Sequence, residues 1–496
     1  MATVKEITTM CKAGQMEEAY ELAKSDYEND PQNVWTQREL GWALYYSLKS
    51  DVENNKRQMF YSHLEELSRL DLLTMQDNAI LFDNLIWKFV EVAKLIPKDR
   101  TDEIDLIYIF LSKYTFNSST AYSALLKQIL HFEKWNRFVE FFEWWNIDNL
   151  TEKDYQPFKL ENGRMSMSLA EQVYIAYSKA LLVLDDKDRI RDFLPKIEKL
   201  MDDYPDMMYP RYYCGKLKLA MGAEREEVLG IIMPFVRMKK TEFWIWQWLY
   251  EVYKGESDIQ IACMLRSVHC RTQETYLGKV RMKLVSMYIV RGDFPRAKYH
   301  LDKIVSCYLQ QGWRLPDEVQ NWINEAWVND TQADSSDGID YKQYTNAILA
   351  RGTNTSIAIV TYVDLNRKRV HLIYAEKKHA IVSSSELGVK VKNGSLLELQ
   401  WIIEKSGDYV VACAKMVDRQ ALKGISYIKF IEGKISIKES NQFAFVNDGE
   451  IKCFINSETI QEYNLVNNDK VSVLTVLDYN KKKENWNWSC VLLIKK

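Results

Sequence analysis

The chain has 496 residues, 47% hydrophobic and 27% charged, a composition that allows a large buried core and excludes a mainly disordered protein. Its 66 basic and 69 acidic residues leave a net charge of −3, so the overall charge gives no argument for nucleic-acid binding. We find no run of about eighteen apolar residues that could cross a membrane and no apolar signal core near the start. The eight cysteines form no CxxC pair, which predicts reduced thiols in a cytoplasmic protein without disulfides.

Proline, glycine and charge divide the chain near residue 330. All nine prolines lie at or before Pro316, whereas eight of the 18 glycines fall in the last 159 residues. Residues 352–496 contain 21 Lys and Arg against 16 Asp and Glu, a net charge of +5, so the preceding residues carry −8 (45 basic against 53 acidic). Between these parts the polar sequence NDTQADSSDG has no hydrophobic period, and we predict a linker at 331–355.

Residues 1–330 have the apolar spacing of amphipathic helices, with hydrophobic side chains at i, i+3, i+4 and i+7. Small residues recur at a fixed step within this part. Gly14 is followed five residues later by Ala19, and Gly292 is followed five residues later by Ala297. Two helices that cross closely need small side chains at the crossing, so this pattern predicts helix hairpins.

The hairpin pattern resembles the tetratricopeptide repeat, a helix–turn–helix unit of about 34 residues. The resemblance is best at 1–48 and 280–308 and poor between 50 and 165, where the sequence is helical but lacks the small residues. It implies an α-solenoid whose concave face binds a protein partner. Within this part the aromatic stretch 243–248 is interpreted as core, with a groove-lining role for one tryptophan as the alternative.

After residue 355 the hydrophobic period changes from that of a helix to the alternation of β-strands. Runs rich in Val, Ile, Tyr and Thr are separated by turn signals such as Lys392-Asn393-Gly394, and no proline interrupts them. Closely spaced short strands of this kind are typical of small barrels. We predict one barrel at 356–420, with five strands of OB-like lengths, and a second at 425–496.

Roughly the last 65 residues carry five short motifs in a fixed order. They are Gly433-Lys434-Ile435, Phe443-Ala444-Phe445-Val446, Cys453-Phe454-Ile455-Asn456, Ser457-Glu458-Thr459-Ile460, and Leu465 through Asp469 to Val471. This order resembles that of the cold-shock domain, a small OB-type barrel. Ala444 and Asn456 replace a glycine and a histidine of the family pattern, and an aromatic residue of the first strand is missing, which implies a weakened nucleic-acid face. Chains that join tetratricopeptide and cold-shock parts are linked with bacterial conflict and defence islands, which implies an accessory or antiviral role.

Strand alternation places three phenylalanines of this barrel on one face. Phe443 and Phe445 point to the same side of one strand, and Lys452 and Phe454 share a side of the next. Unpaired bases stack on such rings for about 1–3 kcal/mol each, so we predict a single-strand binding face. The predicted site is completed by a basic loop and a nearby aromatic residue: Lys481, Lys482, Lys483 and Trp486. The alternative is that the three rings pack against the preceding barrel or the helices.

The barrel predicted at 356–420 has no paired-Phe strand. It has a basic turn, Arg367-Lys368-Arg369, followed by a cluster at 377–379 that contains two lysines and a histidine. A non-specific phosphate contact and a solvated turn are both compatible with these residues.

Motifs for catalysis are weak throughout. Cys263, His269 and Cys270 resemble zinc ligands in composition, but no paired ligand spacing occurs. We find no P-loop, no dinucleotide-binding glycine motif and no HExxH sequence, and no histidine lies in a triad-like context. The sequence therefore predicts no catalytic residue, no metal ligand and no cofactor.

The fold expected from these patterns is that of a multi-domain α + β protein. It consists of a tetratricopeptide-like α-solenoid at 1–330, a linker at 331–355, a divergent OB-like barrel at 356–420 and a cold-shock-like OB domain at 425–496. We expect a non-enzymatic adaptor that binds single-stranded nucleic acid, RNA rather than DNA, through the last barrel and a protein partner through the solenoid. A pure protein scaffold that uses its barrels for docking is the alternative, and an enzyme with an unrecognised site is a third hypothesis.

Overall fold

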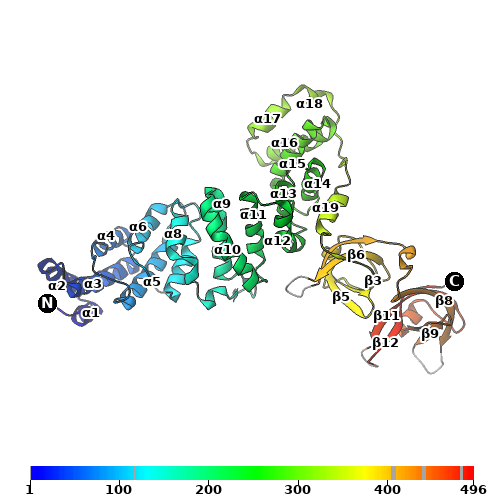
Figure 1. Cartoon of the computed structure of the whole chain (residues 1–496), viewed down its shortest axis with the longest axis horizontal. Coiled ribbons are helices and arrows are strands. Elements are labelled where there is room, and N and C mark those ends of the chain that lie inside the picture. Colours follow the sequence, from blue (N-terminus) through cyan, green and yellow to red (C-terminus); the bar gives the residue numbers. More distant parts are fainter. Residues whose placement is uncertain (1, 117, 404–408, 438–442, 481–483, 496) are drawn as a thin grey trace. The chain divides into compact units, whose positions relative to one another are not determined.

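The structure, a computed structural model, has a helical N-terminal region followed by two β modules (Figure 1). The parts of the chain that it describes are residues 2–116, 118–403, 409–437, 443–480 and 484–495. The chain divides into two compact units, Met1–Ala223 and Glu224–Lys496, so the boundary between them lies within the helical region. None of the helices in the described ranges is both long enough and apolar enough to span a bilayer.

The first unit is built from helices with short connections. Their bounds are α1 (Val4–Lys12), α2 (Met16–Asn29), α3 (Val34–Glu53), α4 (Arg57–Leu67), α5 (Ala79–Leu95), α6 (Thr101–Leu111), α7 (Thr120–Ile129), α8 (Phe138–Trp145), η1 (Ile147–Asn149), η2 (Glu152–Tyr155), α9 (Leu169–Leu184), α10 (Lys187–Asp203) and α11 (Met208–Ala220). A two-stranded hairpin, β1 (Phe158–Lys159) and β2 (Met165–Ser166), precedes α9.

Helix hairpins form where the small residues predict them. Gly14 and Gly292 have φ values of +89° and +70° and supply the left-handed backbone of the turns α1–α2 and α15–α16. Five residues later in each case, Ala19 and Ala297 are fully buried in helices that pack on their neighbours. The hairpins are therefore present, whereas the tetratricopeptide family assignment stays a prediction.

The second unit begins with helices and continues into the β modules. The helices are α12 (Arg225–Met238), α13 (Phe243–Val252), α14 (Ser257–Val268), η3 (Glu274–Tyr276), α15 (Gly278–Val290), α16 (Phe294–Gln311), α17 (Asp317–Ile323), α18 (Ala326–Asp330) and α19 (Tyr341–Leu349). In α13, Trp246 is fully buried and Trp248 is 7% exposed, which confirms the core interpretation for these two tryptophans.

The segment predicted as a linker contains α19. Tyr341, Thr345, Ile348 and Leu349 lie on one buried side of this helix, which packs on α14. Their spacing of four, three and one residues is that of an amphipathic helix, but the polar sequence in front of it concealed the pattern. The irregular parts of 331–355 are thus residues 331–340 and the short turn at 350–353.

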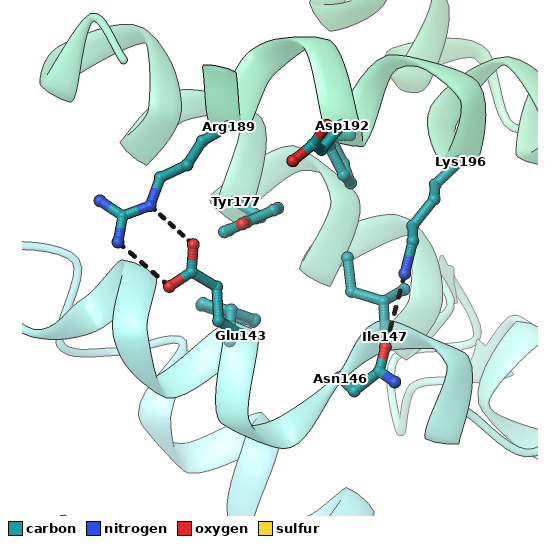
Figure 2. A pocket seen from close by; sticks show the side chains of 9 residues that line it. Glu143, Asn146, Ile147, Tyr177, Arg189, Asp192 and Lys196 are labelled. Carbon is teal, nitrogen blue, oxygen red and sulfur yellow. Dashed lines mark hydrogen bonds and ion pairs between the residues drawn. The ribbon is translucent and has the colours of Figure 1, made fainter. Parts of the chain in front are cut away.

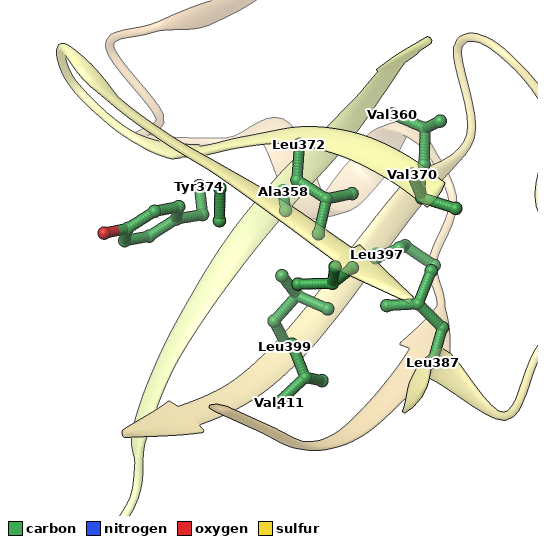
Figure 3. Close-up of a cluster of buried hydrophobic side chains, with 11 residues drawn as sticks. Ala358, Val360, Val370, Leu372, Tyr374, Leu387, Leu397, Leu399 and Val411 are labelled. Atoms are coloured by element: carbon green, nitrogen blue, oxygen red, sulfur yellow. The ribbon is translucent and has the colours of Figure 1, made fainter. Parts of the chain in front are cut away.

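The first β module comprises five strands and a short helix. They are β3 (Asn354–Asp364), β4 (Arg369–Ala375), β5 (Lys378–Ser383), α20 (Ser384–Leu387), β6 (Leu396–Ile403) and β7 (Tyr409–Met416). All neighbours are antiparallel in the order β5-β4-β3-β6-β7. Alternate residues such as Val370, Leu372 and Leu399 converge on its core (Figure 3). In the described part of this module no ladder joins β5 to β7, so it is an open sheet rather than the closed barrel that we predicted.

The C-terminal barrel is closed. Its elements are η4 (Arg419–Leu422), which leads into it, β8 (Ile428–Ile437), β9 (Ala444–Asn447), β10 (Lys452–Ile455), α21 (Ser457–Glu462), β11 (Lys470–Asn480) and β12 (Asn485–Lys495). The strand order around the barrel is β10-β12-β11-β8-β9, and the parallel pair β10–β12 completes the circle. Both modules follow one plan, since in each the first strand pairs with the second and fourth and a helix follows the third. This is the strand connection of an OB-type barrel.

The two β modules share a buried apolar cluster. Ile359 and Ile373, on the outer face of the first module, pack with Leu474 and Val476 of the C-terminal barrel. Tyr427, which precedes β8, donates from its hydroxyl to two carbonyl groups of the first module, at distances of 2.5 and 2.8 Å. The modules are thereby docked to each other by residues other than the three predicted phenylalanines.

Candidate nucleic-acid interface

A tight turn fixes the register of the two strands that carry the predicted site. The Asn447 carboxamide oxygen accepts from the Gly449 amide at 2.9 Å, and an Asp448 carboxylate oxygen accepts from the amide of Ile451 at 2.8 Å. Gly449 has a φ of +106°, which few other residues adopt. Asn and Asp side chains favour such turns because they bond to backbone amides a few residues ahead.

The register that follows from this turn brings the aromatic rings together. Phe445 lies opposite Phe454 in the β9–β10 ladder, while Ala444 and Val446 between them are fully buried in the barrel. The centroids of the Phe443, Phe445 and Phe454 rings are 5.6 to 6.0 Å apart, and all three side chains are half-buried. We call these three rings and Lys452 the Phe face.

Positive charge borders the Phe face on two strands. The Lys452 ammonium lies 4.3 Å from the centre of the Phe445 ring, a cation–π distance. Lys434 and Ser436 of β8 are exposed, and the ladder places them beside Asn447 and Phe445 respectively. The sequence prediction missed these two residues as part of the site, although Ile435 is a core residue and alternation puts both its neighbours outside.

The remaining predicted site residues lie elsewhere. Lys481, Lys482 and Lys483 fall outside the described residues. Trp486 packs on Tyr479 of the neighbouring strand, with ring centroids 5.3 Å apart. Ser489 is the strand neighbour of Phe454, so alternation directs Trp486 to the side opposite the Phe face. The structure therefore brings together four of the eight predicted site residues.

Two residues in the region of the cold-shock motifs, one that departs from the pattern and one that matches it, have structural roles. Asn456, which stands in place of a histidine, caps α21, because its carboxamide oxygen accepts from the Thr459 amide at 2.8 Å. Asp469, which matches the pattern, accepts from the Val466 amide at 2.9 Å and pairs with the Lys495 ammonium at 2.7 Å. The hydrogen bond from Lys495 holds the pKa of the Asp469 carboxyl below its ordinary value, so this carboxylate organises the turn before β11.

The two cysteines of the C-terminal barrel have raised thiol pKa values. Burial raises the pKa of Cys453 to about 11 and that of Cys490 to about 12. Both thiols are therefore protonated near neutral pH, and a protonated thiol is a poor nucleophile and metal ligand.

The residues considered as zinc ligands have other partners. Cys263 is fully buried in α14, where burial raises the pKa of its thiol. The His269 ring stacks on Tyr341 at 4.7 Å and its Nε2 lies 3.0 Å from an Asp337 oxygen. The Cys263 and His269 side chains are thus accounted for by burial, by stacking and by pairing with Asp337.

A cleft of about 240 Å³ lies between α8 and α10 in the first unit (Figure 2). Three of its charged side chains, Glu143, Arg189 and Lys196, are in ion pairs. The Arg189 guanidinium donates to both Glu143 oxygens at 2.7 and 3.2 Å, and the Lys196 ammonium donates to Asp148 at 2.8 Å. The first pair ties α10 to α8 and the second ties α10 to η1, which is a structural role.

Two family models match parts of the chain. Residues 429–493 match the S1/CSD-like domain 2 of the TOTE conflict systems, and residues 208–347 match a domain of unknown function (DUF7017). Comparison with curated proteins and with solved structures gives no match. The first match spans the C-terminal barrel and confirms both the cold-shock-like domain and its link with conflict systems. The second runs from α11 into α19, and so joins α19 to the helices rather than to a linker.

Proposed function

We propose that the chain is a non-enzymatic adaptor that binds single-stranded nucleic acid, RNA rather than DNA, through the Phe face and a protein partner through its helical region. The context is a conflict system in which the adaptor serves antiviral defence. The observation that carries the nucleic-acid part is the Phe face itself, three adjoining half-exposed rings with Lys452 over one of them, on a domain that matches a cold-shock-like family.

The chemistry of the Phe face suits an unpaired strand. A flat aromatic ring offers a stacking surface to any base, but the bases of a duplex are already stacked and paired. Lys434 and Lys452 border the rings and attract the phosphates that link such bases. The acidic balance of the whole chain does not oppose this, because residues 352–496 carry a net charge of +5 (21 basic minus 16 acidic).

The test is filter binding of the full chain to labelled single strands at about 50 and 200 mM salt. We expect binding of an oligoribonucleotide that weakens at the higher salt, with duplex competing poorly. An absence of single-strand binding at the lower salt, where phosphate attraction is strong, would reject the nucleic-acid part.

A feature of the first unit supports the protein-binding part. Trp35 is 55% exposed, with the Arg38 guanidinium 4.9 Å from its ring centre. Beside it, Glu39 is buried and one of its carboxylate oxygens has no hydrogen-bond partner within the described residues. Burial and the nearby Asp26 carboxylate raise the pKa of Glu39 to about 7. An exposed indole beside an unpaired buried carboxyl fits a partner that inserts an apolar side chain with a hydrogen-bond donor.

The pure scaffold is the rival function. It requires the β modules to use their exposed rings for docking a protein partner; the barrel already packs on the first β module of the same chain through another apolar face. The two functions separate experimentally. If the chain is a scaffold, Phe445→Ala abolishes binding of the protein partner, and neither wild type nor the variant binds nucleic acid. If the chain is an adaptor, Phe445→Ala weakens nucleic-acid binding and leaves binding of the protein partner unchanged.

A further inference from the structure

The common strand plan allows the outer faces of the two β modules to be compared position by position. On the C-terminal barrel, the row across the first three strands is Ser436, Phe445 and Phe454. In the first β module, the row across the first three strands contains Tyr362, His371 and Ile381, which are direct neighbours in the β3–β4 and β4–β5 ladders. We call these three residues the Tyr–His row.

A β-bulge turns Tyr362 outward. The β3–β4 register shifts between Val360 and Tyr362, so Val360 faces Leu372 in the core while Tyr362 faces His371 on the outside. Without the extra residue, alternation would place Tyr362 on the core side with Val360. A bulge of this kind changes the direction of a side chain and disrupts the ladder locally. Because bulges are frequent next to functional sites, the outward direction of Tyr362 suggests a role for its side chain.

The Tyr–His row is aromatic and exposed. Tyr362 is 53% exposed and Ile381 is 54% exposed, while the His371 ring is half-buried. The Tyr362 and His371 rings meet edge to face with centroids 5.5 Å apart. One pair further along the same outer face, Ile359 and Ile373 belong to the cluster shared with the C-terminal barrel. The row is therefore the part of this face that the docked barrel leaves open.

Basic side chains lie at both ends of the strands that carry the row. The exposed β3–β4 turn contains Arg367, Lys368 and Arg369, of which Arg367 reaches an acidic neighbour, Asp364, at 4.0 Å. The exposed β4–β5 turn contributes a second group, Lys377, Lys378 and His379. This combination of flat rings with flanking cations complements unpaired bases and their phosphates. Docking of an apolar protein partner would not require the six basic or titratable residues of the two turns.

We propose that the Tyr–His row is a second single-strand binding face, which takes the same strand as the Phe face and extends the site across both β modules. This inference rests on the function proposed above. The shared buried cluster holds the two faces in a fixed relation. For a strand long enough to reach both faces, the second contact is intramolecular and therefore adds affinity.

The test is fluorescence anisotropy of the full chain with oligouridylates of about 6 and about 18 nucleotides, one length within and one beyond the site size of about 4–16 nucleotides for one OB-type module. Wild type should bind the longer strand more tightly than the shorter one. The gain in affinity should exceed the statistical factor that comes from the larger number of positions at which one site can bind a longer strand. The double variant Tyr362→Ala, His371→Ala should bind the short strand as wild type does. It should bind the long strand about 5- to 150-fold more weakly, the factor for one lost stacked base.

Two matched variants separate stacking from folding and from general surface effects. Tyr362→Phe keeps the ring and should retain the affinity for the long strand. Tyr276→Ala removes a tyrosine that is 62% exposed in η3, outside the β modules, and should change neither affinity. A melting curve of the double variant that matches wild type shows that the module remains folded.

The outcomes are distinguishable. If wild type binds the short strand and the double variant keeps the full gain for the long strand, the second face is rejected while the Phe face stands. If wild type binds neither strand, the proposed function itself fails, and the inference fails with it. A loss of affinity for both lengths in the double variant would also overturn the inference, since it assigns the short strand to the Phe face.

Discussion

The two β modules share a strand plan but close it in different ways. In the C-terminal barrel, β10 and β12 pair directly through parallel backbone hydrogen bonds. In the first β module, α20 lies against β5 and β7 at the corresponding place, and a side chain from the helical region completes the edge. The Lys240 ammonium donates to the carbonyl oxygens of Glu386, Val411 and Ala412, at 2.8, 2.5 and 3.1 Å.

This difference shows how one strand topology can give either an open edge that is anchored to the helices or a closed barrel. A strand with unpaired carbonyl groups needs a donor, and in the first module a buried lysine of the α12–α13 connection supplies it. Trp246 in turn donates from its indole nitrogen to the Lys240 carbonyl at 2.9 Å and so positions the backbone of that lysine. The open module is thereby anchored to the helices, while the closed barrel needs no such partner and keeps its aromatic face half-exposed.

The largest expected effect is on single-strand binding by the C-terminal barrel. Replacing Phe445 and Phe454 with Ala should weaken single-strand binding by about 2–6 kcal/mol, since each ring stacks one base. The salt dependence should change little, because no charge is removed. Titrations with a labelled oligonucleotide at several salt concentrations measure both quantities. If the double variant unfolds, the rings are core residues and the Phe face is not a binding surface.

The next effect tests the anchor of the open module. Lys240→Met should destabilise the first module by about 3 kcal/mol, because buried carbonyl groups lose their donor and each such loss costs about 1–3 kcal/mol. Hydrogen exchange should speed up in β7 and stay unchanged in β12. Lys254→Met, which alters an exposed lysine near the end of α13, is the matched control and should have no effect. Equal protection of β7 in wild type and Lys240→Met would contradict the anchor.

The same lysine gives a pH dependence. Burial lowers the pKa of Lys240 to about 8. Above that pH the native state therefore binds fewer protons than the unfolded chain, whose lysines have a pKa of about 10.4. Stability therefore rises with pH through this window for this group. The free energy of unfolding of wild type, measured against that of Lys240→Met, should increase between about pH 8 and 10. A constant difference would show that Lys240 is not buried in solution.

A smaller effect tests the packing of the closed barrel. A Cβ atom at Gly433 would lie 2.7 Å from both the Asn447 carbonyl oxygen and a Val446 methyl group. Gly433→Ala should therefore cost about 1–3 kcal/mol of unfolding free energy, measured by denaturant titration, as overpacking usually does. Gly230→Ala, in a helix with open space around the glycine, should be neutral or slightly stabilising. Equal stability of the two variants would contradict the barrel register.

The smallest effect concerns charge on the Phe face. Replacing Lys434 and Lys452 with Ala should flatten the dependence of log affinity on log salt by about 1.4 units, or about 0.7 per phosphate contact on a single strand. The loss of affinity should be visible mainly at low salt. An unchanged slope would mean that neither lysine contacts a phosphate.

Much of this architecture follows from local sequence rules. Alternation predicts the shared side of Phe445 and Phe454, and the Asn447-Asp448-Gly449 turn sets their register. The change from helical to strand periodicity near residue 355 agrees with the start of β3 at Asn354. These features depend on residues close together in the chain, which is why they could be predicted.

Features that depend on distant partners could not be predicted in this way. The open edge of β7 is completed by Lys240, more than 170 residues earlier in the chain, and nothing in either sequence signals the other. Tyr362 faces outward because of a bulge opposite β4, and a strict alternation from Val360 would have placed it inside. Trp486 was placed beside the Phe face from proximity in sequence, whereas the β10–β12 register puts it on the other side.

Photo-crosslinking tests the central claim most directly. A single-stranded oligoribonucleotide of about 18 residues that carries 4-thiouridine is bound to the full chain at low salt, irradiated, and the adducts are located by mass spectrometry. We predict adducts in β9 and β10 and at Phe443, which precedes β9. These adducts should be lost when an unlabelled single strand competes and retained with duplex competitor. Adducts confined to residues 1–330, or equal competition by duplex, would contradict the assignment of the Phe face.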